Sequence, residues 1–252
     1  PPRSVIKRMS TTTTLHRNAL PAGTALLEYR LEAVLGAGGF GMTYRARDTN
    51  LDKAVVIKEF FPSTLAMRAL DGSVVAVDSS SAHDFKWGLE RFLQEARTLA
   101  RFSHPHIVRV NRYFETNNTG YMVMDYEDGE SIYHYLKREP SPGEARVKEI
   151  LLPLLDGLQS VHAAGFLHRD IKPENIYIRK SGAPVLIDFG SARQALGDST
   201  KTLTAVLTPG YAPLEQYGES GEQGPWTDIY ALGAVDRKST RLNSSHVSES
   251  RM

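Results

Sequence analysis

The sequence predicts an α+β fold in two parts: a small, mainly antiparallel β-sheet with one helix, followed by a mainly helical part. Two strand-like segments flank a glycine-rich turn near residue 38, and a third, apolar strand follows at residues 53–59. Residues 84–102 carry apolar side chains at helical spacing and predict one helix after these strands. A longer helical pattern over residues 144–164 opens the second part.

Composition excludes several classes of protein and of site. The chain has 252 residues, no Cys and a formal net charge of +1. Without Cys there are no disulfides, thiolate zinc sites or Cys nucleophiles, and a reducing, cytoplasmic location is expected. A near-neutral charge is not typical of nucleic-acid-binding proteins, which usually carry a basic excess. No apolar run approaches the roughly 20 residues that span a bilayer, and residues 1–14 lack the apolar core of a signal peptide.

The order of elements follows from the local patterns. Residues 1–25 are predicted to be a disordered leader, with Met9 as the expected true start. Residues 60–83 are predicted to form a long irregular connection with a turn at Asp71-Gly72. Strands are predicted at 29–35, 42–47, 53–59, 113–115, 121–126, 175–179 and 184–187, and further helices at 131–137 and from 227 onward.

The glycine-rich turn, Gly36-x-Gly38-x-x-Gly41, is the first candidate binding feature. Dinucleotide-binding folds use the same spacing, but there the glycines open a helix. Here the glycines lie between two strand-like segments, and Thr43 and Tyr44 do not favour a first helical turn. The pattern therefore favours a strand–turn–strand flap whose backbone N–H groups cover phosphates, with an ordinary glycine-rich hairpin as the alternative.

Lys58 lies at the end of the apolar strand, among β-branched neighbours. A Lys in such a strand is costly to bury without a partner. Its ammonium group either reaches water from the end of the strand or meets anionic groups. Glu95, within the helix at 84–102, is a candidate ion-pair partner, and a Lys held by a Glu and facing phosphates is typical of phosphoryl transfer.

Two further motifs decide between these alternatives. The segment His168-Arg169-Asp170-Ile171-Lys172-Pro173-Glu174-Asn175 follows the long helix, and Asp188-Phe189-Gly190 follows the predicted hairpin. Over residues 29–235 the chain resembles the eukaryotic-like Ser/Thr protein kinases, and most closely their bacterial members. The resemblance implies a bilobal protein-kinase-like fold, with a small sheet lobe at 26–124 and an incomplete, mainly helical lobe at 125–235.

The resemblance also implies an ATP site. Lys58 is expected to contact the α- and β-phosphates and to pair with Glu95. Met124 is expected to be the gatekeeper before the hinge, and Ala54 to pack over the adenine ring. The residues implied to bind ATP are Gly36, Gly38, Gly41, Ala54, Lys58, Met124, Asp125 and Glu127.

The catalytic and metal-binding roles are implied in the same way. Asp170 is expected to accept the proton of the substrate hydroxyl. Lys172 is expected beside the transferred phosphoryl group, and its place two residues after Asp170 is typical of Ser/Thr kinases. Asn175 and Asp188 are expected to hold Mg²⁺, a hard ion that prefers oxygen ligands.

Residues 188–215 resemble an activation loop that is rich in hydroxyl side chains. In the family, an Arg such as Arg169 can grip a phosphorylated residue of this loop. Thr208 aligns with a residue near the substrate hydroxyl and is not expected to be a phosphorylation site. For the other hydroxyl residues of the loop, the alternative is that they stay unmodified. The expected autophosphorylation sites are Thr200, Thr202 and Thr204.

Residues 236–252 resemble no part of a kinase. Residues 236–246 match the translation of a common short-read sequencing adapter without a mismatch, and Ser250-Arg251-Met252 match its continuation. These residues are therefore predicted to be a non-native tail, so that the kinase lobe is cut short after Val235. Apolar surface on the helices that begin near Glu144 and Thr227 is then expected to be exposed.

The sequence thus predicts an ATP- and Mg²⁺-dependent protein Ser/Thr kinase that acts on protein substrates. Two alternatives stay open: a nucleotide-binding pseudokinase that acts as a scaffold, and a fragment made inactive by truncation. Neither nucleic-acid binding nor a membrane segment is expected within these residues, although a full-length parent can be tethered to a membrane.

Overall fold

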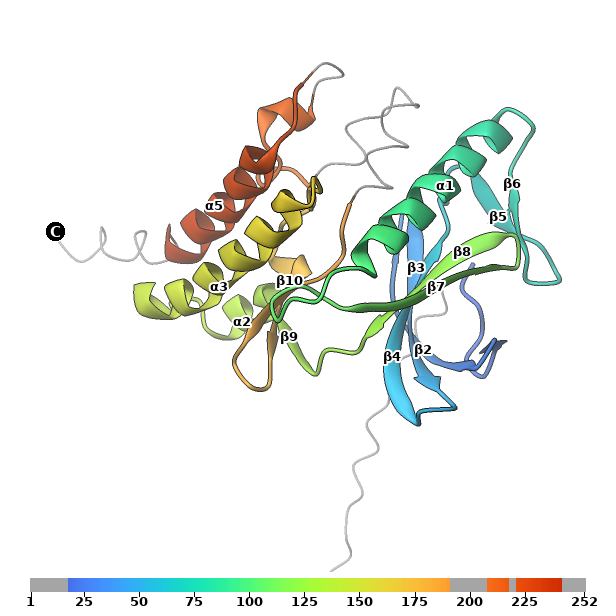
Figure 1. Ribbon diagram of the computed structural model, residues 1–252, viewed down its shortest axis with the longest axis horizontal. Coiled ribbons are helices and arrows are strands. Elements are labelled where there is room, and N and C mark those ends of the chain that lie inside the picture. The colour runs from blue at the N-terminus through green and yellow to red at the C-terminus, as the bar shows by residue number, and fades with distance from the viewer. Residues whose placement is uncertain (1–17, 191–207, 218–220, 242–252) are drawn as a thin grey trace, which may run out of the picture.

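The computed structural model describes residues 18–190, 208–217 and 221–241, and its N-terminal part is a six-stranded antiparallel sheet (Figure 1). The strand order is β1-β2-β3-β4-β8-β7, which confirms the predicted antiparallel sheet. The strands are β1 (Ala25–Leu26), β2 (Tyr29–Gly38), β3 (Gly41–Asp48), β4 (Lys53–Phe60), β7 (Val110–Thr116) and β8 (Thr119–Asp125).

Strands β2 and β3 meet at the glycine-rich turn. Gly38 pairs with Gly41, so Gly39 and Phe40 form the tip of the hairpin. A strand rather than a helix follows the turn, which confirms the predicted flap and argues against a dinucleotide-binding fold. A Cβ atom on Gly41 would lie 2.6 Å from the carbonyl oxygen of Glu59, so only glycine allows β3 and β4 to approach this closely.

One helix, α1 (Ser81–Leu99), packs against this sheet. It starts and ends three residues before the predicted range of 84–102. Its buried face includes Phe85, Phe92 and Leu99, in agreement with the apolar spacing in the sequence, and it also buries Glu95. The rings of Phe85 and Phe92 both contact Phe60 at the end of β4, which fixes the helix against the strand that carries Lys58.

The connection between β4 and α1 contains a hairpin that the sequence did not predict. Strands β5 (Ala66–Arg68) and β6 (Val74–Ala76) pair around a turn at Asp71 and Gly72, where the backbone N–H of Ser73 donates to Asp71 at 2.9 Å. The prediction of the turn at Asp71-Gly72 is therefore confirmed, whereas the prediction of an irregular connection around it was wrong. Each strand has only three residues, too few for a clear alternating pattern.

The segment before β1 is part of the folded domain. Leu20 is buried, and its backbone N–H donates to the hydroxyl of Tyr44 at 3.1 Å. The predicted disordered leader, residues 1–25, therefore extended too far, because a single apolar anchor in a polar stretch gives no periodic signal. Residues 1–17, including the expected start at Met9, lie outside the described residues.

The second part of the chain is mainly helical, as predicted, and lies on the other side of the molecule from α1 (Figure 1). Helices α3 and α5 pack side by side there. A three-stranded sheet in the order β11-β10-β9 accompanies them. The elements are β9 (Gly129–Ser131), α2 (Ile132–Arg138), α3 (Gly143–Ala163), β10 (Ile176–Arg179), β11 (Pro184–Leu186) and α5 (Pro225–Arg241), with short 3₁₀ turns at Pro173–Asn175 and Leu214–Gln216.

Helix α5 continues past Val235 into the segment predicted to be a non-native tail. Ser239 is buried, and its hydroxyl donates to the carbonyl of Val235 at 2.8 Å. The ammonium group of Lys238 lies 3.7 Å from the centre of the Tyr211 ring. Residues 236–241 are thus helical, and residues 242–252 lie outside the described residues, so that a non-native tail at residues 236–252 stays a prediction.

Apolar surface is exposed along α3 and α5, as expected. Leu152, Leu155 and Ile229 line a shallow groove between the two helices, and the most exposed of them, Leu152, keeps 59% of its surface accessible. Within the part of the chain that the structure describes, no helix is both long and apolar enough to cross a membrane.

Candidate active site

Two adjoining cavities lie between the sheet and the helical part. The first is lined by the glycine-rich turn together with Lys58, Glu95, Asp170 and Asp188. The second is lined by the end of β8 and the residues after it, which include Met124, Asp125 and Glu127. Both cavities share Gly36, Thr43 and Asp188, so together they form one continuous cleft.

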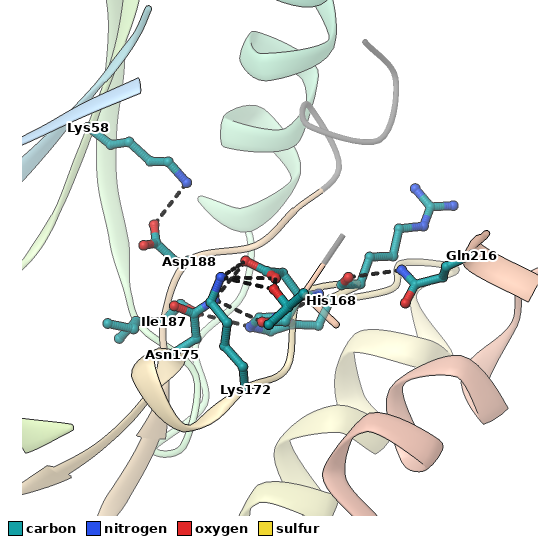
Figure 2. Close-up of polar contacts among 10 residues, drawn as sticks. Lys58, His168, Lys172, Asn175, Ile187, Asp188 and Gln216 are labelled. Atoms are coloured by element: carbon teal, nitrogen blue, oxygen red, sulfur yellow. Dashed lines mark hydrogen bonds and ion pairs between the residues drawn. The ribbon is translucent and has the colours of Figure 1, made fainter. Parts of the chain in front are cut away.

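In the first cavity, Lys58 on β4 faces Asp188 (Figure 2). The Lys58 Nζ atom lies 2.8 Å from Asp188 Oδ1, and both side chains are partly shielded from water. Asp188 follows β11 with a φ angle of 60°, a left-handed conformation that is uncommon outside glycine and recurs at functional sites. Glu95 is buried and lines the same cavity, while its pairing with Lys58 stays a prediction.

Asp170 is the centre of a second cluster, which also includes Lys172 and Asn175, both labelled in Figure 2. The Lys172 Nζ atom lies 2.9 and 3.2 Å from the two carboxylate oxygens of Asp170. The Nδ2 atom of Asn175 donates to the backbone oxygen and to Oδ2 of Asp170, at 2.8 and 3.0 Å. Thr208 donates its hydroxyl to Asp170 Oδ1 at 3.1 Å, which brings the segment after residue 207 to the same carboxylate.

Asp228 at the start of α5 supports the loop that carries Asp170. Its carboxylate accepts the backbone N–H groups of His168 and Arg169, at 2.8 and 2.7 Å, and contacts His162 at 2.8 Å. Burial raises the pKa of Asp228, but the bonds from His162 and from the backbone outweigh this and lower it overall. Arg169 has a φ angle of 66°, so the buried carboxylate compensates a strained backbone at this point.

His168 is fully buried beneath the loop. Its Nε2 atom lies 3.0 Å from the carbonyl oxygen of Ile187, and its ring packs against Phe189. Burial lowers the pKa of His168, against the opposite influence of Asp228 and Asp170, and this favours the neutral ring. These contacts let His168 brace the loop that carries Asp170. They also link this loop to the strand that precedes Asp188.

The second cavity differs from the sequence-based prediction at one position. Val56 lines it, whereas Ala54 is not among its described lining residues. Ala54, Val56 and Lys58 share one face of β4, because side chains alternate along a strand. The candidate that packs over a base is therefore Val56, two residues before Lys58, and the assignment of Ala54 is corrected.

The segment after Met124 is held by charged side chains from both parts of the molecule. Lys53 Nζ lies 2.7 Å from the Asp125 carboxylate, and Asn111 donates to the same oxygen at 2.8 Å. Burial raises the pKa of Asp125, but these two partners lower it below its usual value. Arg179 on β10 pairs with Glu127 through two hydrogen bonds of 2.5 and 2.7 Å, so the backbone of this segment is well fixed.

The side chains at the cleft suit a Mg²⁺ ion bound together with a nucleotide better than a metal ion held by protein ligands alone. Among the described residues, no group of three or more His, Asp or Glu side chains is arranged to hold a metal ion. Mg²⁺ usually takes only one or two protein carboxylates and completes its shell with phosphates and water. The carboxylate of Asp188 and the amide oxygen of Asn175 are ligands of the required kind, and Lys58 supplies positive charge for phosphates.

Comparison with known proteins agrees with this geometry. The family model for the protein kinase domain matches residues 29–239. The chain belongs to the protein kinase family. The match ends four residues beyond Val235, within helix α5.

Individual relatives place the chain more closely. It is 33% identical over 216 residues to the serine/threonine-protein kinase PknA of Nostoc, and this match covers 81% of the chain and 35% of the relative. It is 34% identical to the serine/threonine-protein kinase PknD of Mycobacterium tuberculosis, with 86% of the chain and 30% of the relative covered. These relatives are bacterial Ser/Thr kinases, as the sequence predicted, and the chain spans about a third of their length.

A solved structure, the apo form of PpkA-294, is similar to the chain with a TM-score of 0.80 and 43% identity. The similarity covers 88% of this chain and 78% of that chain. It supports the bilobal kinase fold.

Sequence reasoning missed two residues near the cleft. Glu59 follows Lys58 on β4 and is completely buried. Gln216 donates its side-chain amide to the carbonyl of Arg169 at 3.0 Å (Figure 2). No sequence pattern pointed to Gln216. For Glu59, a carboxylate within an apolar strand was a usable signal.

Proposed function

We propose that this chain carries an ATP-dependent protein kinase activity that phosphorylates Ser and Thr hydroxyls of proteins. The observation that carries the proposal is the meeting of two clusters in one cleft: Lys58 with Asp188, and Asp170 with Lys172 and Asn175. The names of the relatives support the same activity. Phosphoryl transfer needs mainly positioning and positive charge, and this cleft offers both.

The acceptor hydroxyl is proposed to bind at Asp170. The hydroxyl of Thr208 already donates to Asp170 Oδ1, which supports the idea that this oxygen receives the hydroxyl of a substrate Ser or Thr. Asp170 then takes the proton as the hydroxyl oxygen forms its bond to the γ-phosphorus and the bond to the leaving ADP oxygen breaks. Lys172, 2.9 Å from Asp170, places a positive charge where the transferred group carries negative charge.

The nucleotide is proposed to span both cavities. The glycine-rich turn and Lys58 line the first cavity and suit the phosphates, while Val56, Met124 and Ile187 line the second and suit a base. We propose that the backbone groups of Asp125 and Glu127 bind its polar edge. Asp188 and Asn175 are the proposed Mg²⁺ ligands, and Mg²⁺ bound there adds positive charge beside the phosphates.

Autophosphorylation is proposed for Thr200, Thr202 and Thr204, which lie outside the described residues. The observation in its favour is that residues on both sides of this segment, Asp188 and Thr208, lie at the cleft. Phosphopeptide mapping of active protein is expected to find at least one modified residue between 190 and 208. Active protein without any modification in this range would contradict this part of the proposal.

The decisive experiment measures ATP binding and phosphate transfer in the same preparations. Purified chain is titrated with Mg·ATP by calorimetry and assayed for transfer of labelled γ-phosphate to a generic protein acceptor, beside the variant Lys58→Met. The wild-type chain is expected to bind ATP and transfer phosphate, and the variant to lose transfer by about a hundredfold or more. Binding of ATP without transfer by the wild type would favour the scaffold alternative instead.

A further inference from the structure

Glu59, next to Lys58 on β4, is a carboxylate without exposed surface. Its side chain lies on the opposite face of the strand from Lys58, because neighbouring residues alternate. Glu59 accepts hydrogen bonds from the hydroxyls of Tyr44 on β3 and Tyr121 on β8, at 2.8 and 2.7 Å. A buried carboxylate is costly unless it is paired, so a cation is required as well.

Arg68 on β5 supplies that cation. Its Nη2 atom lies 2.6 Å from Glu59 Oε2, and only 10% of its side chain is exposed. Burial lowers the pKa of Arg68, but the hydrogen bond and the charge of Glu59 raise it above its usual value. The pair thus joins the β5–β6 hairpin directly to the strand that carries Lys58.

The same guanidinium holds two backbone segments. Arg68 Nε donates to the carbonyl oxygen of Asn18 at 2.6 Å, and Nη1 donates to that of Gly72 at 3.0 Å. Leu20, close to Asn18 in the chain, donates its backbone N–H to Tyr44, which also bonds Glu59. One buried cluster therefore connects the segment before β1, the β5–β6 hairpin and three strands of the sheet.

The segment that leads from Glu59 to Arg68 also holds the tip of the glycine-rich turn. The backbone N–H of Phe61 donates to the carbonyl of Phe40 at 3.1 Å, and that of Ser63 donates to Gly39 at 3.0 Å. Gly39 and Phe40 are the two residues at this tip, and Phe40 lines the first cavity. Residues 59–68 thus contact both elements that face the proposed phosphate site, the turn and β4.

We propose that the Glu59–Arg68 ion pair is a positioning device, which holds Lys58 and the tip of the glycine-rich turn in the arrangement that binds the phosphates of ATP. The inference rests on the proposed kinase activity. Both residues act through Lys58 and the turn and contact no substrate themselves. A buried ion pair seldom stabilises a fold more than well-packed apolar groups do, whereas its directional bonds fix the register of the segments that it joins. Small displacements of positioning groups are costly, because a shift of about 1 Å can reduce a rate about a hundredfold.

The test separates positioning from stability with the variants Arg68→Met, Glu59→Gln and the double variant Glu59→Gln/Arg68→Met. Arg68→Met leaves the Glu59 carboxylate buried and unpaired, so its melting temperature is expected to fall. The double variant removes both charges, and its melting temperature is expected to recover. Arg47→Met is the matched control, because Arg47 on β3 pairs with the exposed Asp52 on the surface of the same sheet.

The kinetic readout is the dependence of phosphate transfer on ATP and, separately, on the protein acceptor. In Arg68→Met and in the double variant, kcat/KM for ATP is expected to fall about tenfold or more, while KM for the protein acceptor is unchanged. Arg47→Met is expected to match the wild type in both. We therefore expect the double variant to recover the melting temperature of the wild type but not its kcat/KM for ATP.

Other outcomes have distinct meanings. If the double variant recovers kcat/KM for ATP together with its melting temperature, the pair only supports the fold and the inference is wrong. If Arg68→Met uses ATP like the wild type, the inference is also wrong. If Arg68→Met does not fold, the double variant alone decides. If the wild-type chain itself does not transfer phosphate, the proposed function fails, and the positioning role fails with it.

Discussion

Lys58 Nζ and Asp188 Oδ1 lie 2.8 Å apart, although 130 residues separate them in the sequence. Lys58 belongs to the antiparallel sheet, and Asp188 follows the last strand of the smaller sheet in the helical part. Their contact joins the two parts of the molecule at the cleft. Both residues line the first cavity together with the glycine-rich turn and Asp170.

Thr208 tests how the carboxylate of Asp170 is aligned. Its hydroxyl donates to Asp170 and accepts a longer contact of 3.4 Å from Lys172. The variant Thr208→Val keeps the shape of the side chain but loses this bond, and kcat is expected to fall about tenfold, as the loss of roughly 1–1.5 kcal/mol predicts. Thr208→Ser is the matched control and is expected to stay near the wild-type rate. Equal rates for Val and wild type in a steady-state transfer assay would show that Thr208 has no part in aligning Asp170.

Gly41 and Gly36 offer a matched pair for the packing of the glycine-rich turn. A Cβ atom on Gly41 would clash with the Glu59 carbonyl, whereas one on Gly36 has no neighbour within 4 Å among the described residues. Gly41→Ala is therefore expected to destabilise the fold by about 1–3 kcal/mol, and Gly36→Ala to leave stability almost unchanged. Urea denaturation followed by tryptophan fluorescence measures both values. A loss in Gly36→Ala as large as that in Gly41→Ala would contradict the proposed close approach of β3 and β4.

The buried neutral ring of His168 predicts how stability depends on pH. Burial lowers its pKa in the folded state below the ordinary value of 6.5, so the unfolded chain binds the proton more readily. The contribution of the neutral His168 ring to the free energy of unfolding is therefore complete above pH 6.5 and is lost as the pH falls below that value. Melting temperatures measured from about pH 7.5 to about pH 5 are expected to decline, and His168→Phe is expected to show a shallower decline. A wild-type profile that rises toward acid pH would contradict a neutral His168.

The exposed apolar groove between α3 and α5 predicts self-association. Leu152 and Ile229 keep 59% and 45% of their surface accessible. The double variant Leu152→Gln/Ile229→Gln is expected to reduce light scattering of concentrated protein without lowering its melting temperature, because it removes apolar surface from contact with water. Leu51→Gln is the matched control, because Leu51 is 73% exposed and lies away from the groove in the β3–β4 turn. An equal effect of both variants would show that the groove has no special role.

Much of this architecture was predictable because it depends on local patterns. The turn at Gly36, Gly38 and Gly41, the strand that ends at Lys58 and the motif around Asp170 are short and continuous in sequence. Alternation along β4 places Lys58 and Val56 on one face, but the sequence-based assignment chose Ala54, which lies two residues further from Lys58. The position of a residue along β4, not its residue type, decides which apolar side chain lines the second cavity.

The remaining features depend on contacts between distant segments. The β5–β6 hairpin has strands of three residues, and its attachment through Arg68 to Glu59 appears only after the chain has folded. Leu20 is buried because Tyr44 and the β5–β6 turn meet it, which no local pattern signals. Helix α5 continues beyond Val235 because a helix propagates easily once its first turns are packed.

Asp170 provides the most direct test of the proposed mechanism. Asp170→Asn keeps the size of the side chain, and a melting curve with a calorimetric titration of Mg·ATP checks that fold and nucleotide binding are retained. If Asp170 accepts the substrate proton, the transfer of labelled phosphate to Ser and Thr residues of a protein acceptor is expected to fall about 10²–10⁴-fold. Transfer by folded, ATP-binding Asp170→Asn at the wild-type rate would contradict the account.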